Sequence, residues 1–198
     1  MNGKPTLARE AVLESAIAAF ARKGYAGTSV QDILRATGLS KPTLYYYFES
    51  KAGLFRGILD FAHDECFRLM RESVAAVSAC EQRLVAVAAA IFQFAERRQD
   101  LMRLVFATVF AAPEEIPKGC IDLTKRRRNF EFVLAIVRAG QKERLIDSRY
   151  DVEEIAHGIF GAISHQVRTH LLMPKGKLDR KRAERIVALF LDGARRKN

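Results

Sequence analysis

Apolar residues recur three and four positions apart along most of this chain, which is the spacing of one face of an α-helix. At the N-terminal end this spacing predicts three short helices. The first begins at Thr6, whose hydroxyl suits a helix N-cap, and ends at Gly24, which suits the left-handed conformation that closes many helices. Its buried face is expected to carry Leu13, Ile17 and Phe20.

The next two helices are short and closely joined. Thr28 or Ser29 can cap the second helix, because each is followed three positions later by a residue that completes a capping box. The second helix ends at Gly38, and Ser40 then caps the third. Two helices separated by a short turn containing glycine predict a helix-turn-helix motif over about residues 29–48. Helical hairpins that bind no DNA share this pattern.

The rest of the chain predicts longer helices with polar breaks between them. They are expected over about residues 51–77, 82–97, 100–111, 120–140, 151–172 and 179–196. Asp151 and Asp179 suit the N-caps of the last two. The fold class is therefore all-α, with a small domain over residues 1–50, a larger helical domain over residues 51–198 and no flexible linker between them.

The composition agrees with a helical globular protein. Of 198 residues, 49% are hydrophobic and 28% are charged, and 12 Gly and 5 Pro are too few for the turns of a β-sandwich or barrel. No apolar stretch reaches the roughly 20 residues of a membrane helix, and Arg9 and Glu10 precede any apolar run, which argues against a signal peptide. The cysteines, Cys66, Cys80 and Cys120, lack metal-ligand spacing. We therefore expect a cytoplasmic protein with reduced thiols, no metal and no cofactor.

The formal net charge is +10, which suggests a nucleic-acid partner. The positive excess, however, lies mainly in residues 97–150 and 175–198, whereas residues 1–50 are nearly balanced. A basic run at residues 125–128 is most simply a solvated helix face. Bulk charge therefore supports an acidic partner without locating its binding site.

The third helix has two chemically different sides. Leu44 and Phe48, four positions apart, define its buried side. The opposite side and the two flanks carry ring and hydroxyl groups, from Pro42, Thr43, Tyr45, Tyr46 and Tyr47, with Tyr46 almost opposite the buried side. Hydroxyls that meet base edges or phosphates, and carbons that meet thymine methyl groups, suit the major groove of DNA. Packing of this aromatic side on another protein helix is the alternative.

Two lysines favour DNA over a protein partner. Lys41 opens the third helix and Lys51 opens the fourth. A cation in the first turn of a helix opposes the helix dipole and costs about 0.3–1 kcal/mol. A phosphate nearby reverses this effect, because helix N-termini and lysines both attract anions. The two lysines therefore indicate a phosphate track beside the aromatic side.

Residues 27–51, GTSVQDILRATGLSKPTLYYYFESK, resemble the DNA-binding signature of TetR-family bacterial transcriptional regulators. The core T-L-Y-Y-x-F-x-S-K, over residues 43–51, is specific to that family, and the resemblance covers roughly residues 7–60. The sequence departs from the family pattern at Tyr47, where many members have His, and at Leu34, where Ala is usual. The first departure concerns an operator contact and the second concerns packing.

The resemblance implies a homodimeric, sequence-specific DNA-binding regulator, most simply a repressor that a small-molecule effector releases from its operator. The third helix of each subunit would enter a major groove. Matched position by position, the DNA contacts would come from Thr28, Ser29, Lys41, Pro42, Thr43, Tyr45, Tyr46, Tyr47 and Lys51. An activator, or a DNA-binding protein that needs no effector, is the alternative. An enzyme is the least supported class, because the sequence carries no HExxH, GxSxG or phosphate-binding glycine motif.

The resemblance also places an effector pocket and a dimer interface in the larger domain. Residues suited to an effector pocket are Phe67, Met70, Phe92, Met102, Phe106, Phe110, Phe130 and His165, although plain core is the simpler interpretation of the apolar ones. Residues suited to a dimer interface on the last two helices are Ile155, Ile159, Phe160, Ile163, Ile186, Leu189 and Phe190. Such a stripe can equally face its own domain.

Overall fold

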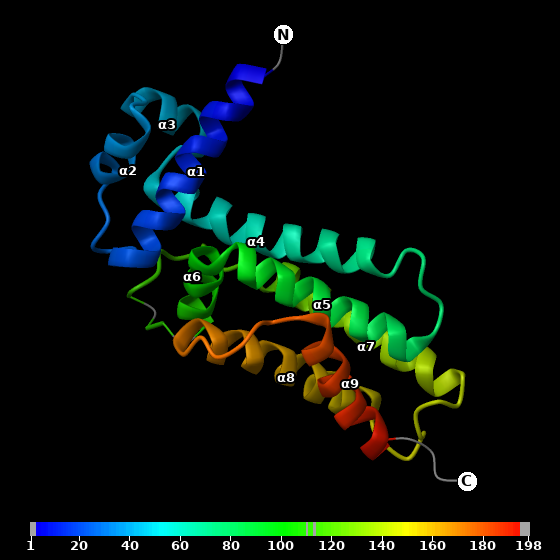
Figure 1. The fold of residues 1–198 in the computed structure, drawn as a ribbon. Helices are drawn as coiled ribbons and strands as arrows, with labels where there is room; N and C mark the ends of the chain where they lie inside the picture. The colour runs from blue at the N-terminus through cyan, green and yellow to red at the C-terminus, as the bar shows by residue number, and fades with distance from the viewer. Residues whose placement is uncertain (1–2, 110, 113, 195–198) are drawn as a thin grey trace. The chain divides into compact units, whose positions relative to one another are not determined.

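The structure is a computed structural model that describes residues 3–109, 111–112 and 114–194. Within these residues it contains helices and no strand, which confirms the all-α prediction (Figure 1). The helices described are α1 (Gly3–Lys23), α2 (Val30–Thr37), α3 (Lys41–Phe48), α4 (Lys51–Ser73), α5 (Cys80–Arg97), α6 (Gln99–Val109), α7 (Leu123–Lys142), α8 (Val152–Leu172) and α9 (Arg180–Ala194).

Most helix boundaries lie within a few residues of the predicted ones. The start of α1 is wrong in the prediction: the helix begins at Gly3, so Thr6 lies inside it and is not its N-cap. Pro5 is compatible with the earlier start, because a proline in the first turn gives up no intrahelical hydrogen bond. α4 ends at Ser73, a few residues before its predicted end. The predicted last residue of the final helix, at position 196, lies outside the described residues.

Contacts within the described residues divide the chain into two compact units. The first unit comprises residues 1–62 and 99–122, and the second comprises residues 63–98 and 123–198. The division falls inside α4, whose first turns belong with α1–α3 and α6. A functional boundary near residue 50 stays a prediction.

In the first unit α1 packs against α2, α3 and α6 (Figure 1). The side of α1 that was predicted to be buried is buried, with Leu13, Ile17 and Phe20 at most 4% exposed. Gly24 ends the helix at a φ of +70°, and its N–H donates to the carbonyl of Phe20 over 2.9 Å. The left-handed closure expected at this glycine is therefore confirmed.

An aromatic cluster of Phe20, Tyr25 and Phe55 joins α1 to the start of α4. The ring centroids lie 5.8 Å apart for Phe20 and Tyr25, 5.2 Å for Phe20 and Phe55, and 5.1 Å for Tyr25 and Phe55. Phe20 and Phe55 are each 1% exposed. Ring pairs at such distances contribute about 0.5–1.5 kcal/mol beyond the burial of their area. The cluster therefore fixes the start of α4 on α1.

In the second unit α5 contacts α7, α8 and α9, and α8 contacts both α7 and α9. Asp151 caps α8 as predicted, because its carboxylate accepts the backbone N–H of Glu153 over 2.6 Å. Asp179 accepts the N–H of Arg182 over 2.9 Å at the start of α9. The N-caps of both final helices are thus the ones that the sequence predicts.

The junction between α3 and α4 is a tight turn. The Ser50 hydroxyl accepts the N–H of Gly53 over 2.9 Å, which caps α4. A Cβ at Gly53 would overlap the carbonyl oxygen of Phe48, a backbone atom that cannot move away as a side chain can. Only glycine therefore fits this position without a shift of the junction.

Replacing Gly53 with alanine is expected to destabilise the protein by about 1–3 kcal/mol, the usual cost of overpacking. The measurement is the midpoint of urea unfolding. Gly57, on the same helix, is the matched control, because a Cβ there would meet Phe48 ring atoms at 3.6 Å, an ordinary contact. Gly57→Ala is expected to be neutral or stabilising by up to about 1 kcal/mol, because alanine favours helices. Equal destabilisation by both changes would contradict the overlap at Gly53.

Candidate nucleic-acid interface

The helix-turn-helix predicted from the sequence is present. Ser29 is the N-cap of α2, and Gly38 ends this helix at a φ of +66°, donating its N–H to the carbonyl of Leu34 over 3.0 Å. Ser40 caps α3 by accepting the N–H of Thr43 over 3.3 Å. The two helices are therefore separated by a short turn that contains the predicted glycine.

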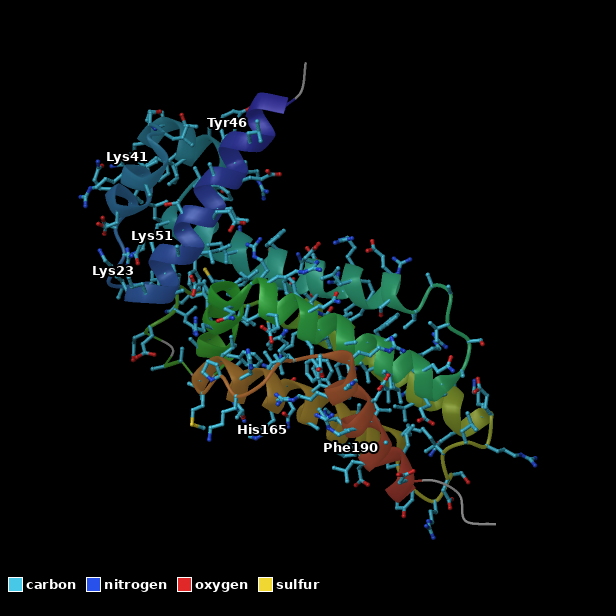
Figure 2. All side chains as sticks on the ribbon, in the orientation of Figure 1. Lys23, Lys41, Tyr46, Lys51, His165 and Phe190 are labelled. Atoms are coloured by element: carbon cyan, nitrogen blue, oxygen red, sulfur yellow. The ribbon has the colours of Figure 1, made fainter. Side chains whose placement is uncertain are left out.

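α3 has the two sides that its sequence predicts. Leu44 and Phe48 are 0% and 6% exposed, whereas Tyr46 is 81% exposed. Figure 2 labels Tyr46 together with Lys41 and Lys51. Tyr45 is 37% exposed, and Tyr47 is partly exposed with its ring 5.0 Å from that of Tyr46. A helix of eight residues with two core residues leaves these rings no place in the interior. The exposed side therefore presents aromatic carbon and phenol hydroxyls to a partner.

The polar residues at the start of α3 extend this surface. Lys41 and Pro42 are exposed and Thr43 is partly exposed. The Lys41 ammonium lies 5.8 Å from the centroid of the Tyr45 ring, and the Thr43 hydroxyl lies 2.8 Å from that of Ser40. One helix thus brings a cation, two hydroxyls and tyrosine rings to one surface.

Lys51 begins α4, as predicted, and its ammonium is held by an aromatic ring. The Nζ atom lies 4.1 Å from the centroid of the Tyr25 ring. Such cation–π contacts contribute about 0.5–1 kcal/mol at exposed sites and more when the charge is desolvated. Partial burial lowers the pKa of Lys51 from its usual value. The contact with Tyr25 was missed by the sequence analysis, because the two residues are far apart in the chain.

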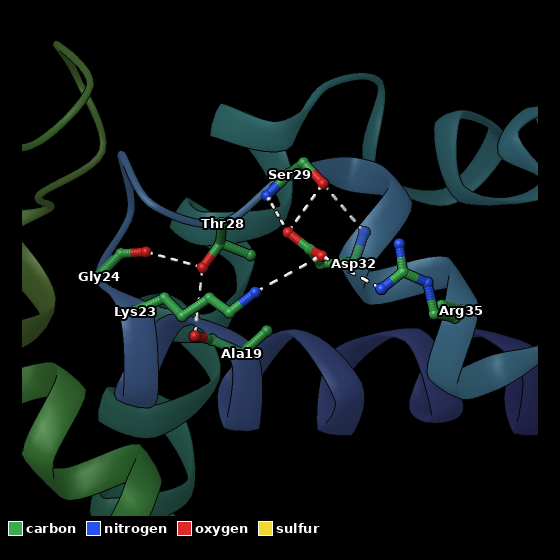
Figure 3. A network of polar contacts seen from close by, with 7 residues as sticks. All are labelled: Ala19, Lys23, Gly24, Thr28, Ser29, Asp32 and Arg35. Carbon is green, nitrogen blue, oxygen red and sulfur yellow. Dashed lines mark hydrogen bonds and ion pairs between the residues drawn. The ribbon is translucent and has the colours of Figure 1, made fainter.

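Thr28 and Ser29, which the sequence analysis treated as equivalent caps and phosphate contacts, have different places. Thr28 is 1% exposed, and its hydroxyl lies 2.8 Å from the carbonyl oxygen of Gly24 and 3.2 Å from that of Ala19 (Figure 3). A phosphate contact by the Thr28 hydroxyl is therefore incompatible with this structure, because the hydroxyl bonds inside the unit. Ser29 is exposed at the N-terminus of α2.

Asp32 connects the cap of α2 to α1 (Figure 3). Its carboxylate accepts the backbone N–H of Ser29 over 3.0 Å and the Ser29 hydroxyl over 2.8 Å, while its own N–H donates to that hydroxyl over 3.0 Å. Lys23 of α1 lies 3.5 Å from the carboxylate, and Arg35 lies 3.8 Å from it. The two bonds from Ser29, with the charge of Lys23, lower the pKa of Asp32 to about 2.

The low pKa of Asp32 predicts a loss of stability in acid. Because folding lowers this pKa from 3.8 to about 2, the charged carboxylate stabilises the folded chain above about pH 4, and this contribution disappears as the pH falls toward 2. The measurement is the free energy of unfolding against pH for the protein and for Asp32→Asn. The difference between the two is expected to shrink with acidification, whereas a difference that stays constant would contradict this role.

The family of the chain follows from a comparison with known sequences. The family model for "Bacterial regulatory proteins, tetR family" matches residues 12–58, which include the whole helix-turn-helix and the start of α4. The DNA-binding part of the chain is a TetR-family domain. The chain is therefore a DNA-binding transcriptional regulator, and the family consists of regulators rather than enzymes.

Individual relatives match either most of the chain or only its DNA-binding part. The HTH-type transcriptional activator FasR of Mycolicibacterium smegmatis is 29% identical in an alignment 182 positions long, which covers 79% of this chain and 83% of FasR. The HTH-type transcriptional repressor ComR of Escherichia coli is 45% identical over 60 residues, 30% of this chain and 29% of ComR. The fatty acid degradation regulator FadR from Bacillus halodurans shares the fold over 100% of both chains, with a TM-score of 0.84 and 17% identity.

The residues predicted to line an effector pocket belong to both units, and their role as a pocket stays a prediction. Met70 and Phe92 are fully buried in the second unit, while Met102 and Phe106 belong to the first. Phe110 lies outside the described residues. The other three are engaged separately in the second unit: Phe67 with Phe132, Phe130 stacked on His157, and His165 beside Arg168 and Thr169. None of the seven described residues lines the cavity of about 440 Å³ in the first unit.

The residues predicted for a dimer interface divide into two groups. Ile155, Ile159 and Ile163 are at most 8% exposed, so they face the core of their own unit and are not available to a partner. α8 packs against α5, α7 and α9 of the same unit. The remaining residues are accessible: Leu189 is 74% exposed, and Phe160, Ile186 and Phe190 are partly exposed.

None of the helices in the described part of the chain combines the length and the hydropathy that a membrane span requires. No group of three or more His, Cys, Asp or Glu residues among them has the proximity needed to hold a metal ion. Burial raises the pKa of Cys66 to about 12 and that of Cys80 to about 11, so both thiols stay protonated at neutral pH. These thiols are weak nucleophiles as a result.

Proposed function

We propose that this regulator is a homodimeric repressor of the cytoplasm and nucleoid, released from a palindromic operator by a small-molecule effector. The exposed side of α3, with Tyr46 at its centre and Lys41 at its start, is the observation that carries the proposal. Tyr46 exposes a large apolar ring that the fold does not use, and an unused ring of this size marks a contact surface. Its hydroxyl and carbon suit base edges and thymine methyl groups in a major groove.

The phosphate contacts of the proposed complex lie on both sides of this surface. Ser29 is exposed at the N-terminus of α2, where backbone N–H groups attract anions. Lys41 and Lys51 begin α3 and α4. These contacts would fix the position of α3 on the duplex, while Pro42, Thr43 and the tyrosines Tyr45, Tyr46 and Tyr47 would read the bases.

A dimer is needed because a single helix of eight residues reads few base pairs. The accessible apolar residues of α8 and α9, Phe160, Ile186, Leu189 and Phe190, support an interface there. Two copies of α3 held about one turn of DNA apart, roughly 34–36 Å, would read two half-sites. An effector that binds better to another spacing would shift the population away from the form that binds DNA.

Selection of bound duplexes from a random pool tests the dimeric DNA-binding model. The expected result is an enriched sequence with two inverted half-sites, whose centres are about 10 base pairs apart or slightly more. Enrichment of one unrepeated site would contradict the dimeric model, and no enrichment would contradict sequence-specific binding. Analytical ultracentrifugation of Leu189→Arg then tests the interface, because a charge at this exposed position should favour the monomer.

Activation is the second candidate function, because FasR, a relative that covers 79% of this chain, is a transcriptional activator. A promoter that carries the selected site, fused to a reporter, distinguishes the two. Repression predicts higher expression when the regulator is absent, and activation predicts lower expression. The Tyr46→Ala variant is the control, because it should behave as the absent regulator in either case.

Replacing Lys51 with alanine is expected to weaken binding to specific and unrelated duplexes by a similar factor. The salt dependence of binding should flatten by about one unit in log K against log salt, as for the loss of one phosphate contact. Titrations at several salt concentrations measure this slope. Lys175, an exposed lysine of the second unit, gives the control Lys175→Ala, which should leave the slope unchanged. If Lys51→Ala kept the original salt dependence, Lys51 would not be a phosphate contact.

A further inference from the structure

The first unit contains a cavity of about 440 Å³ that the proposed repressor mechanism does not use. Pockets that bind small molecules have volumes of about 300–1,000 Å³. The aromatic cluster of Phe20, Tyr25 and Phe55 forms one wall, and Leu104 and Thr108 of α6 contribute to another. The cavity is therefore large enough for a small ligand, and the partly exposed Tyr25 ring offers an aromatic surface for an apolar part of it.

The cavity stays open because several residues around it have short side chains. Four of the lining residues are alanines: Ala21, Ala26, Ala107 and Ala111. An alanine side chain ends at Cβ, so none of these reaches across the space. A leucine at one of them would occupy part of the volume, which gives a direct way to close the site.

The charged residues of the lining favour an anion. Lys23 and Arg103 contribute two cations, and Glu115 contributes one carboxylate. Lys23 lies 3.5 Å from Asp32, and Arg103 lies 3.2 Å from Asp100, with both cations more than 40% exposed. Exposed ion pairs of this kind contribute about 0–1 kcal/mol, so an anionic ligand can compete for either cation. The Glu115 carboxylate accepts the N–H of Ala112 over 3.1 Å, within its own loop.

We propose that this cavity binds a small carboxylate with an apolar or aromatic body. The ring or chain of the ligand packs on the Tyr25 ring, behind which Phe20 and Phe55 are buried, and the carboxylate pairs with Lys23 and Arg103. The site is distinct from a pocket in the second unit, because every residue that lines it belongs to the first unit, which also carries the helix-turn-helix.

Two residues of the lining also contact the proposed DNA-binding residues. Lys23 pairs with Asp32, which holds the Ser29 cap of α2 (Figure 3). Tyr25 holds the ammonium of Lys51 on the face of its ring. A ligand that draws Lys23 away from Asp32, or moves the Tyr25 ring, changes two phosphate-contacting positions from inside the first unit. This consequence for DNA binding rests on the proposed function, whereas ligand binding itself does not.

The binding test uses 4-phenylbutyrate and its uncharged counterpart 4-phenylbutanol as probes on the full chain. Nuclear magnetic resonance spectra are recorded during each titration, with the signals of Tyr25, Phe55 and Leu104 assigned. The expected result is saturable shifts of these signals with the acid and binding weaker by about tenfold with the alcohol, since a charge-assisted hydrogen bond is lost. Absence of saturable shifts with the acid, or equal binding of both probes, would overturn the proposal.

Two variants locate the site. Ala107→Leu should abolish the shifts by filling the cavity, while Ala76→Leu, at an exposed turn of the second unit, adds the same volume elsewhere and should bind the probe normally. Lys23→Gln should weaken binding of the acid by about tenfold and leave binding of the alcohol unchanged. Unchanged binding of the acid by Ala107→Leu would place the probe elsewhere and overturn the assignment.

The effect on DNA is measured separately, with the selected operator duplex and saturating 4-phenylbutyrate. The expected result is weaker operator binding by the original chain and no effect of the probe on Ala107→Leu. A chain that binds the probe at this cavity but ignores every duplex would contradict the proposed function and leave the ligand site standing. A chain that binds the operator but not the probe would overturn the ligand site and leave the proposed function standing.

Discussion

Replacing Tyr46 with alanine is expected to remove most of the operator affinity while leaving the fold intact. Tyr46 is 81% exposed, so the folded chain loses almost no packing when its ring is removed. A good contact to a base is worth about 1–3 kcal/mol, and a dimer would lose it at both half-sites. The expected loss is therefore about thirtyfold or more for specific binding.

Fluorescence anisotropy with the selected operator and with an unrelated duplex measures this loss. Binding to the unrelated duplex should change little, because it depends mainly on the lysines. Tyr46→Phe is the matched control, since it keeps the ring and removes only the hydroxyl. An affinity between those of the original chain and of Tyr46→Ala would show that the ring and the hydroxyl both contribute to operator binding. Operator binding by Tyr46→Ala at the original affinity would exclude the exposed side of α3 as the recognition surface.

The sides of α3 could be predicted because two residues determine the rotation of the whole helix. Leu44 and Phe48 are four positions apart on a helix of eight residues, and both had to be buried. Once they are placed, the 100° between successive residues leaves Tyr46 on the opposite side. The prediction used only the geometry of a single helix, which follows directly from the spacing of residues in the sequence.

The choice between Thr28 and Ser29 could not be predicted in the same way. Both residues have the local pattern of a capping box, so the pattern allows either as the cap. The structure decides by tertiary contacts: Thr28 turns inward to the carbonyl groups of Ala19 and Gly24, and Ser29 remains at the helix end. The contact of Lys51 with the Tyr25 ring also depends on tertiary folding and has no signal in the sequence.

The larger domain was predicted less well because an apolar stripe does not identify the surface that covers it. Ile155, Ile159 and Ile163 have the spacing expected of an interface, yet their own unit buries them. Met70 and Phe92, which were suggested for an effector pocket with plain core as the simpler interpretation, are buried. Helical periodicity predicts that one face of a helix is buried. Only the packing of the neighbouring helices shows whether its own domain or a partner chain covers that face.

Replacing Phe55 with alanine is expected to give the largest loss of stability among the changes considered. Phe55 is 1% exposed and contacts both Phe20 and Tyr25, so its removal leaves a hole between α1 and α4. Removing a buried phenylalanine typically costs about 3–5 kcal/mol, against a total stability of about 5–15 kcal/mol for most proteins. Urea unfolding followed by circular dichroism measures this loss.

Phe61→Ala is the matched control for this prediction, because it makes the same change on the same helix at a partly exposed position. Its expected cost is clearly smaller, since less apolar area returns to water. Phe55 also lines the cavity and holds the ring that contacts Lys51, so a Phe55→Ala chain that folds at low temperature should also bind all duplexes more weakly. Equal costs at the two positions would mean that the aromatic cluster does not hold α4 on α1, and the coupling of the cavity to Lys51 would lose its structural basis.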